Sequence, residues 1–472
     1  MHPLDHLAQR LDHLHHPIVR LGSAYQHRLI ATEPGSPATY IHAPSAGAAP
    51  DQAYLYLTTR RGTGSVGGSP VDFLYALDVT TPSTPKLLWK HSSSDTGFGA
   101  LAQTWSQPQI VSIRGNANPV LIMGMGYDAA ANDPNLQTAP TEGRGVMVMD
   151  ALTGALIWQA GASVSGATTN LTVAGMTFDI PADVTPFDSD LDGYADRVYA
   201  ADTGGNVWRI NIGDASPTNW TVDKLASLGG GIGSGANARK FLFAPDVVRA
   251  SANVGYDSVL IGSGDREHPF DTTVSNRFYL IKDTHAINYR PATVITEGTA
   301  GSNAGVANQL LDVSSDLVQG GTSTQMAAAT TALATASGWY ITFGTGTNGT
   351  GATGAKVVGS ATTAGGTVFF GTNSPATPAT NACTNLGEAR LYAVSYIDGS
   401  AAIDNNKNGI LTVSDRSGVR NAGGFPPTPV AGTIANADGT ITTFACFGTT
   451  CETPPNTGGG RRYLQYWRRT KQ

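Results

Sequence analysis

A hairpin unit that recurs along the chain constrains its fold more than any other feature. The clearest copies span residues 74–89, 146–158 and 198–210. Each has a short β-type run, an aspartate, a turn rich in Thr, Pro or Gly, and a second run carrying tryptophan. This pattern predicts a β-hairpin, in which the Asp side chain bonds the turn backbone and the Trp packs between neighbouring sheets.

The spacing of the hairpins predicts a β-propeller. The clear copies recur about every fifty to seventy residues, which suits a four-stranded blade with loop insertions. Weaker copies follow at 277–283 and 390–401, and further strand candidates at 258–264, 338–344 and 366–372. A β-sandwich array is the alternative, but it would not predict a recurrent Asp–turn–Trp hairpin. We therefore expect an all-β chain.

Composition narrows the classes of function. The 57 glycines among 472 residues indicate many turns and short strands. Charged residues make up 14% and the formal charge is −6, which gives no electrostatic case for nucleic acid or an anionic membrane. No apolar run is long enough to form a transmembrane segment, and residues 1–17 lack the apolar core of a signal peptide.

The first residues predict one short amphipathic helix. Leu4, Leu7, Leu11 and Leu14 fall on one helical face, and Pro17 ends the run. Its histidines are interpreted as a polar face and not as metal ligands.

Three cysteines are present. Cys446 and Cys451 bracket a short loop containing glycine and could close a small disulfide, which would fit an oxidising compartment. Cys383 is left over.

An acidic loop at 188–196 carries the strongest chemical signal. Its carboxylates are Asp188, Asp190, Asp192 and Asp196. Alternate residues of a tight loop turn toward one centre, and calcium is the natural counter-ion because it takes six to eight hard oxygen ligands. Gly193 can take the positive φ of the bend, Tyr194 would offer its backbone carbonyl, and Asp196 would close the site directly or through a water.

This loop is not a complete EF-hand. Its twelfth residue is Tyr199, where an EF-hand has a bidentate Glu. The residues that follow alternate like a strand, so we expect a calcium loop that leads into a β-strand. A solvated acidic turn is the alternative, and magnesium fits less well because it keeps its waters.

A second, weaker candidate loop spans 404–415. Its potential ligands are Asp404, Asn406, Asn408, the carbonyl of Ile410, Thr412 and Asp415, with Gly409 at the bend. Less negative charge and the neighbouring Lys407 weaken the attraction for an ion. An Asn-rich turn without metal is the alternative.

The block 262–269 contains Asp265, Arg266, Glu267 and His268. An acid–base role is conceivable, because histidine titrates near neutral pH, but we favour a turn braced by an Arg–carboxylate pair. The chain has no Walker A, HExxH or G-x-S-x-G motif, so we expect no enzyme.

The order of these signals resembles a known family. The matching segments are 25–28 (YQHR), the first hairpin, 104–110, 124–129, the acidic loop with 196–212, and 262–283. Together they resemble the C-terminal β-propeller domain of the PilY family of type IV pilus biogenesis and tip-associated adhesin proteins, over nearly all of the chain from about Tyr25.

The resemblance implies a modified propeller of seven blades with calcium on Asp188, Asp190, Asp192, the carbonyl of Tyr194 and Asp196. It implies that calcium regulates pilus extension against retraction, twitching motility and surface attachment. Implied partners are minor pilins at the pilus tip and host or abiotic surfaces, and the implied location is the cell surface, the outer membrane or the secreted fraction.

Full-length family members carry a signal peptide, a long N-terminal region and a first blade that are not found in this sequence. We therefore interpret 1–52 as a helix and linker left from an incomplete first blade, and 53–472 as the propeller. Two alternatives stay open: a quinoprotein-type dehydrogenase that uses calcium and a quinone, and a non-functional truncated remnant. The continuous acidic loop and the lack of an adjacent cysteine pair argue against the dehydrogenase.

Overall fold

The computed structural model describes residues 37–454, with gaps at 46–47, 62–63, 67–68, 72, 135–136, 250–253, 285, 287, 303, 345–353, 376–386, 421–422 and 436–440. The helix expected at 1–17 and the third cysteine, Cys383, lie outside the described residues.

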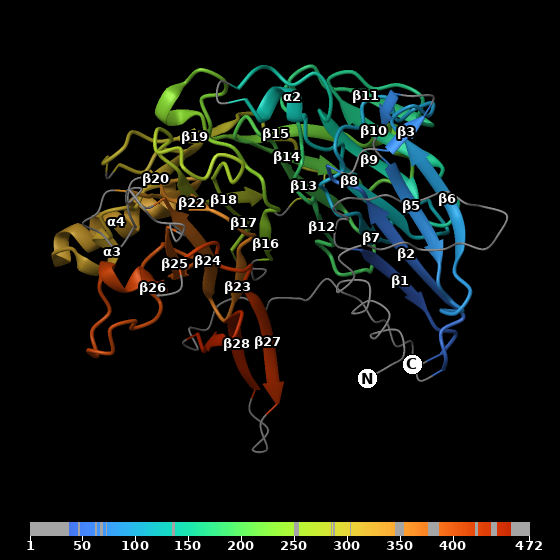
Figure 1. Ribbon diagram of the computed structural model, residues 1–472. Coiled ribbons are helices and arrows are strands. Elements are labelled where there is room, and N and C mark those ends of the chain that lie inside the picture. The colour runs from blue at the N-terminus through green and yellow to red at the C-terminus, as the bar shows by residue number, and fades with distance from the viewer. Residues whose placement is uncertain are drawn as a thin grey trace, which may run out of the picture.

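The described chain is built from antiparallel sheets that follow one another in an arc, from blue to red in Figure 1. Blade 1 comprises β1 (Ala38–His42), β2 (Gln52–Thr58), β5 (Phe73–Asp78) and β6 (Lys86–Ser92), with the small pair β3 (Gly64–Val66) and β4 (Ser69–Val71) inserted. Blade 2 comprises β7 (Gln109–Val111), β8 (Val120–Gly124), β9 (Gly145–Asp150) and β10 (Leu156–Gly161), with β11 (Thr169–Thr172) parallel to β10. Blade 3 comprises β12 (Thr185–Phe187), β13 (Arg197–Ala201), β14 (Asn206–Asn211) and β15 (Thr221–Ser227).

Blade 4 comprises β16 (Asp246–Val248), β17 (Tyr256–Gly262), β18 (Arg277–Thr284) and β21 (Gly338–Thr342). Two short strands, β19 (Ile295–Glu297) and β20 (Gln309–Asp312), join its edge to β15. Blade 5 comprises β22 (Lys356–Val357), β23 (Thr362–Ala364), β24 (Thr367–Ser374), β25 (Glu388–Ser395) and β26 (Ser417–Arg420). Blade 6 comprises β27 (Val430–Ala435), β28 (Ile441–Phe447) and β29 (Thr450–Glu452).

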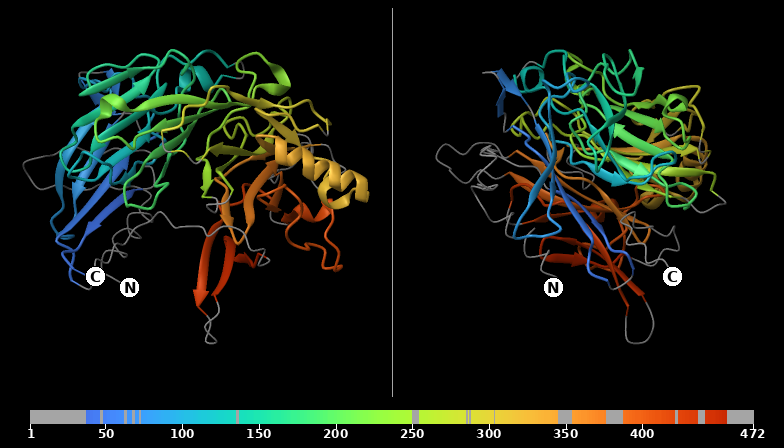
Figure 2. Two further views of the ribbon diagram at one scale, coloured as in Figure 1. Left: turned by 180° about the vertical axis from the view of Figure 1, so that it is seen from behind. Right: turned by 90° about the vertical axis from the view of Figure 1, so that its right-hand side faces the viewer.

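Helices are few among the described residues. They are α2 (Ala129–Asn132), α3 (Leu317–Gly320) and α4 (Ser323–Thr335), with the 3-10 turns η1 (Pro217–Asn219), η2 (Gly235–Asn237) and η3 (Val413–Arg416). Helix α4 lies on the outer side of the arc in both Figure 1 and the left view of Figure 2. Within the described ranges, we find no helix with the length and apolar character needed to cross a membrane.

The β-propeller predicted from the hairpin repeat is confirmed. The described residues form six blade-like sheets, compared with the seven that the resemblance implied. Blade 1 has four strands, and β1 begins at Ala38, inside the segment 1–52 that was interpreted as helix and linker.

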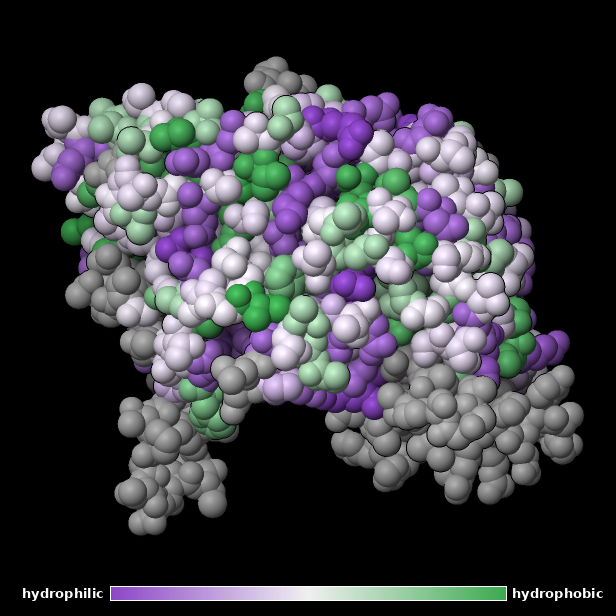
Figure 3. All heavy atoms as spheres, turned by 90° about the horizontal axis from the view of Figure 1, so that it is seen from above, coloured by the Kyte–Doolittle hydropathy of each residue, from purple (hydrophilic) through white to green (hydrophobic). Residues whose placement is uncertain are grey.

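Aromatic side chains fill the spaces between neighbouring blades, as the hairpin pattern predicted. Trp158 of blade 2 meets Trp220 of blade 3 edge to face, with ring centroids 5.4 Å apart. Phe278 of blade 4 stacks on Phe370 of blade 5 at 3.9 Å. These contacts bury large apolar areas between the sheets. On the face seen from above, the remaining hydrophobic residues occur in separate groups among polar ones (Figure 3).

The Asp–turn–Trp unit forms the predicted side-chain-capped turn. Asp202 is fully buried at the end of β13, and its Oδ1 accepts the backbone N–H of Gly204 and of Asn206, both at 2.9 Å. Its Oδ2 accepts the indole N–H of Trp208 at 2.8 Å. In this hairpin the aspartate thus joins the turn to the tryptophan that packs between blades. In the first hairpin the indole N–H of Trp89 donates instead to the carbonyl of Ala151.

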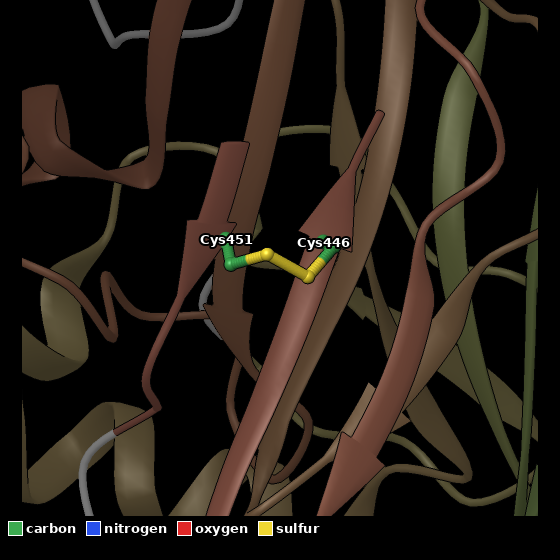
Figure 4. Close-up of a disulfide and its surroundings, with 2 residues drawn as sticks. All are labelled: Cys446 and Cys451. Atoms are coloured by element: carbon green, nitrogen blue, oxygen red, sulfur yellow. A yellow bond between two sulfur atoms is a disulfide. The ribbon is translucent and has the colours of Figure 1, made fainter. Parts of the chain in front are cut away.

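The expected disulfide is present between Cys446 of β28 and Cys451 of β29 (Figure 4). The two cysteines face each other across the antiparallel pair of strands. The bond therefore links two strands of blade 6, which has three strands among the described residues.

Asp202→Ala should lower the free energy of unfolding by about 3 kcal/mol, because it leaves buried N–H donors without an acceptor. Asp78→Ala is the matched control, since Asp78 occupies the same position in the first hairpin but accepts the N–H of Thr80 at a half-buried site. We expect it to cost about 1 kcal/mol. Urea denaturation measures both, and equal losses would refute the role assigned to Asp202.

Candidate metal centre

The acidic loop 188–196 connects β12 to β13 in blade 3. These strands are antiparallel neighbours, with Phe187 opposite Arg197. The N–H of Asp196 donates to the carbonyl of Phe187 at 2.9 Å, and the carbonyl of Asp196 accepts the N–H of Ile212 at 2.7 Å. The base of the loop is therefore fixed by the sheet.

Two left-handed residues bend the loop. Gly193 has a φ of +94° and Leu191 a φ of +66°. A Cβ added to Gly193 would meet nothing within 4 Å, so glycine is favoured here by its backbone conformation and not by lack of space. The positive φ predicted for Gly193 is confirmed.

Three carboxylates each use one oxygen to hold the loop backbone. Oδ1 of Asp190 accepts the N–H of Asp192 at 3.2 Å, and Oδ1 of Asp192 accepts the N–H of Tyr194 at 2.9 Å. Oδ2 of Asp196 accepts the N–H of Ser189 at 2.9 Å and its hydroxyl at 2.8 Å. The second oxygen of each carboxylate is left for another partner.

Asp188 uses both of its oxygens within the loop. They accept the N–H groups of Leu191 at 2.6 Å and of Gly193 at 2.8 Å. Burial raises the pKa of Asp188, and the negative charges of Asp196 and Asp192 add to the effect. The rise in pKa thus comes mainly from burial, with a smaller part from the neighbouring negative charges.

An arginine from blade 2 reaches the three remaining oxygens. Nη1 of Arg114 donates to Oδ1 of Asp196 at 2.6 Å. Its Nη2 donates to Oδ2 of Asp192 at 2.5 Å and to Oδ2 of Asp190 at 3.2 Å. The hydrogen bond to Asp196 raises the pKa of the guanidinium. Arg114 lies 76 to 82 residues before these partners, so no local sequence pattern could have indicated it.

The oxygen set has the chemistry that a calcium ion requires. Asp188, Asp190 and Asp196 each offer an oxygen, and these three atoms lie within 4.8 Å of one another. Hard carboxylate oxygens at such separations suit Ca²⁺. Asp192 lies outside this group of three and contacts Arg114. The ligand roles of the predicted residues, including the Tyr194 carbonyl, stay predictions. The Tyr194 ring lies 5.9 Å from the Arg114 guanidinium.

The second loop, 404–415, has the same turn geometry as the first. Lys407 and Gly409 have φ values of +57° and +82°, and they occupy the positions of Leu191 and Gly193. Asp404 accepts the N–H of Gly409 at 2.7 Å, as Asp188 accepts that of Gly193.

The side chains of the second loop are held by its own backbone. Oδ1 of Asn406 accepts the N–H of Asn408 at 3.0 Å, and Oδ1 of Asn408 accepts that of Ile410 at 2.8 Å. The buried Asp415 accepts the N–H of Thr412 at 3.0 Å. The structure thus brings together the residues predicted for this loop, whose role in metal binding stays a prediction.

The block 262–269 is a braced turn, as we favoured, but the bracing arginine is not its own Arg266. Glu267 pairs with Arg61 of blade 1 at 2.6 Å, and Arg61 also pairs with Asp133 of blade 2 at 2.7 Å. Arg266 instead lies over the ring of Phe425.

His268 takes part in the same brace. It contacts Asp265 through Nδ1 at 2.9 Å and the carbonyl of Asp133 through Nε2 at 3.0 Å. Both ring nitrogens therefore have partners, and the block connects blades 1, 2 and 4.

The fold and the site together define a β-propeller domain with an acidic loop in its third blade. No family model matches the chain. Part of it is 32% identical, over 173 residues, to a type IV pilus biogenesis factor PilY1 homolog of Xylella fastidiosa, and 27% identical, over 249 residues, to type IV pilus biogenesis factor PilY1 of Pseudomonas aeruginosa. These regions cover 36% and 47% of the chain but only 10% and 19% of the two relatives.

The fold agrees with these relatives. The crystal structure of the P. aeruginosa PilY1 C-terminal domain superposes with a TM-score of 0.57 and 19% identity, covering 89% of this chain and 84% of that one. At this identity the likeness shows the fold, and the sequence matches point to the same family. The resemblance to the PilY family seen in the sequence is therefore confirmed, since the chain is similar to PilY1 proteins in sequence and to a PilY1 C-terminal domain in fold.

The inter-blade brace predicts a dependence of stability on pH. Hydrogen bonding to Arg61 holds the pKa of Asp133 below its usual value. A lowered folded-state pKa contributes stability that is present above the unfolded-state pKa of about 4 and is lost as the pH falls through the folded-state pKa. We expect Arg61→Gln to lose less stability than the parent between about pH 5 and pH 3, measured by urea denaturation.

Arg266→Gln is the control for this measurement, because it removes a neighbouring arginine that lies over Phe425. It should keep the pH dependence of the parent. The same pH dependence in Arg61→Gln and the parent would contradict the assignment.

Proposed function

We propose that this chain is the calcium-binding β-propeller module of a type IV pilus biogenesis protein and that it acts without catalysis. One observation carries the proposal. The loop 188–196 uses one oxygen of Asp190, of Asp192 and of Asp196 for its own backbone and turns the other toward a cationic partner, which in this structure is the guanidinium of Arg114. The similarity to PilY1 proteins supports the assignment to pilus biogenesis.

The mechanism is electrostatic ordering. When bound, calcium supplies a divalent charge that offsets the repulsion among four carboxylates. Asp188 shapes the bend through Leu191 and Gly193, and with Asp190 and Asp196 it offers one of the three clustered oxygens. Asp192 adds the fourth carboxylate. The ion can shift the domain between two states only by binding one of them more tightly.

The loop is well placed to pass such a shift on to its surroundings. The N–H of Ala195 donates to the carbonyl of Ser112 at 2.9 Å, which ties blade 3 to the β7–β8 connection of blade 2. Ordering of the loop therefore acts on the contact between two blades.

In this proposal the ordered loop makes the propeller competent to bind minor pilins at the pilus tip and host or abiotic surfaces. Calcium thereby regulates pilus extension against retraction, twitching motility and surface attachment. The protein acts at the cell surface, and the disulfide between Cys446 and Cys451 fits such an oxidising environment.

Calcium titration calorimetry tests the site. We expect Asp190→Asn to weaken binding at least about tenfold, because it removes a charged ligand while keeping an oxygen for the N–H of Asp192. Asp214→Asn is the matched control, since Asp214 is also exposed and also accepts an N–H two residues ahead, that of Ser216. It should bind like the parent.

Asp404→Asn in the same experiment reports on the second loop, where we expect loss of a weaker binding event with the strong one unchanged. If Asp190→Asn binds calcium as tightly as the parent, the proposed main site is wrong.

A further inference from the structure

We propose that Arg114 is a built-in competitor of the cation at the loop 188–196, so that calcium binds by displacing a guanidinium that neutralises the site in its absence. This inference rests on the proposed calcium site and concerns how its affinity is set. It assigns a regulatory role to a residue from another blade.

The loop backbone and Arg114 use different oxygen atoms of the same three carboxylates. The loop backbone occupies Oδ1 of Asp190, Oδ1 of Asp192 and Oδ2 of Asp196. Arg114 holds the three opposite atoms, Oδ2 of Asp190, Oδ2 of Asp192 and Oδ1 of Asp196. The atoms available to an ion are thus the atoms that the guanidinium already contacts.

A calcium ion and the Arg114 guanidinium exclude each other at these oxygen atoms. Calcium needs its oxygen ligands at about 2.3–2.6 Å, and Arg114 holds the same oxygens at 2.5–3.2 Å. An ion on these atoms would place a divalent charge beside the guanidinium, with the shared oxygens between them. Like charges at such short range repel strongly where solvent screening is incomplete, and Asp196 is fully buried.

The Arg114 side chain can leave the acidic loop without rearrangement of the backbone that carries it. The carbonyl of Ser112 is held by Ala195. Gly115, with a φ of +86°, packs so closely on Ala215 that an added Cβ would lie 2.0 Å from its carbonyl oxygen. The chain on both sides of Arg114 is therefore anchored, and the exchange is a movement of one partly exposed side chain.

The consequence is a site whose affinity depends on a contact between blades. Without the ion, Arg114 ties blade 2 to the acidic loop of blade 3. With the ion, this tie is released while the backbone bond between Ser112 and Ala195 can remain. Calcium therefore changes which groups are exposed beside the loop, including the guanidinium and the Tyr194 ring near it.

Calorimetry and thermal melts of the full chain, with calcium chloride or with a chelator, test the inference. We expect Arg114→Gln to bind calcium at least tenfold more tightly than the parent, and Arg114→Lys to fall between them. In chelator, Arg114→Gln should melt at a lower temperature than the parent, because its carboxylates lose their counter-charge. Saturating calcium should remove that difference.

Arg290→Gln is the matched control, because it removes a guanidinium from a single aspartate, Asp223, far along the chain. It should bind calcium like the parent.

The outcomes separate the two proposals. Binding by the parent, with equal or weaker binding by Arg114→Gln, would overturn the competition and leave the calcium site standing. Binding by Arg114→Gln alone would support a competitor strong enough to mask the site. No binding by either protein would refute the calcium site itself, and the competition with it.

Discussion

Burial of both faces of each sheet is the constraint from which the architecture follows. Every residue of β9, β13, β14 and β24 is buried. A strand can be buried throughout only if its sheet has neighbours on both faces, and an arc of sheets packed face to face provides them. Polar residues in such strands then need partners inside the protein. Arg197 and Arg209 have them in Asp257 and Asp283 of blade 4, all four side chains being fully buried.

Patterns in the sequence predicted the structural features that are formed by residues close together in the chain. The turn at Asp202, the bend at Gly193 and the pairing of Cys446 with Cys451 involve residues at most five positions apart. Arg114 and Arg61 were missed because their partners are distant in sequence, and the pairing becomes visible only when the blades are assembled. The blade count also depends on assembly, because the hairpin repeat marks blades only where Asp and Trp are both present.

The two loops have similar backbone geometry but carry different numbers of charged side chains. Both have left-handed residues at the fourth and sixth positions and a first aspartate that accepts the N–H of the glycine. The first loop carries four carboxylates and, held against three of them, an arginine from the neighbouring blade. In the second loop Asn406, Asn408 and Thr412 stand at the positions of Asp190, Asp192 and Asp196. Their neutral side chains do not repel one another as carboxylates do and need less compensation.

Asp196 and Arg197 are consecutive, yet their side chains lead to different blades. Asp196 meets Arg114 of blade 2, while Arg197 meets Asp257 of blade 4. Charged contacts from both neighbours of blade 3 thus converge on a single peptide link at the start of β13. Tension applied across these three blades would be carried in part by the two side chains that flank this link.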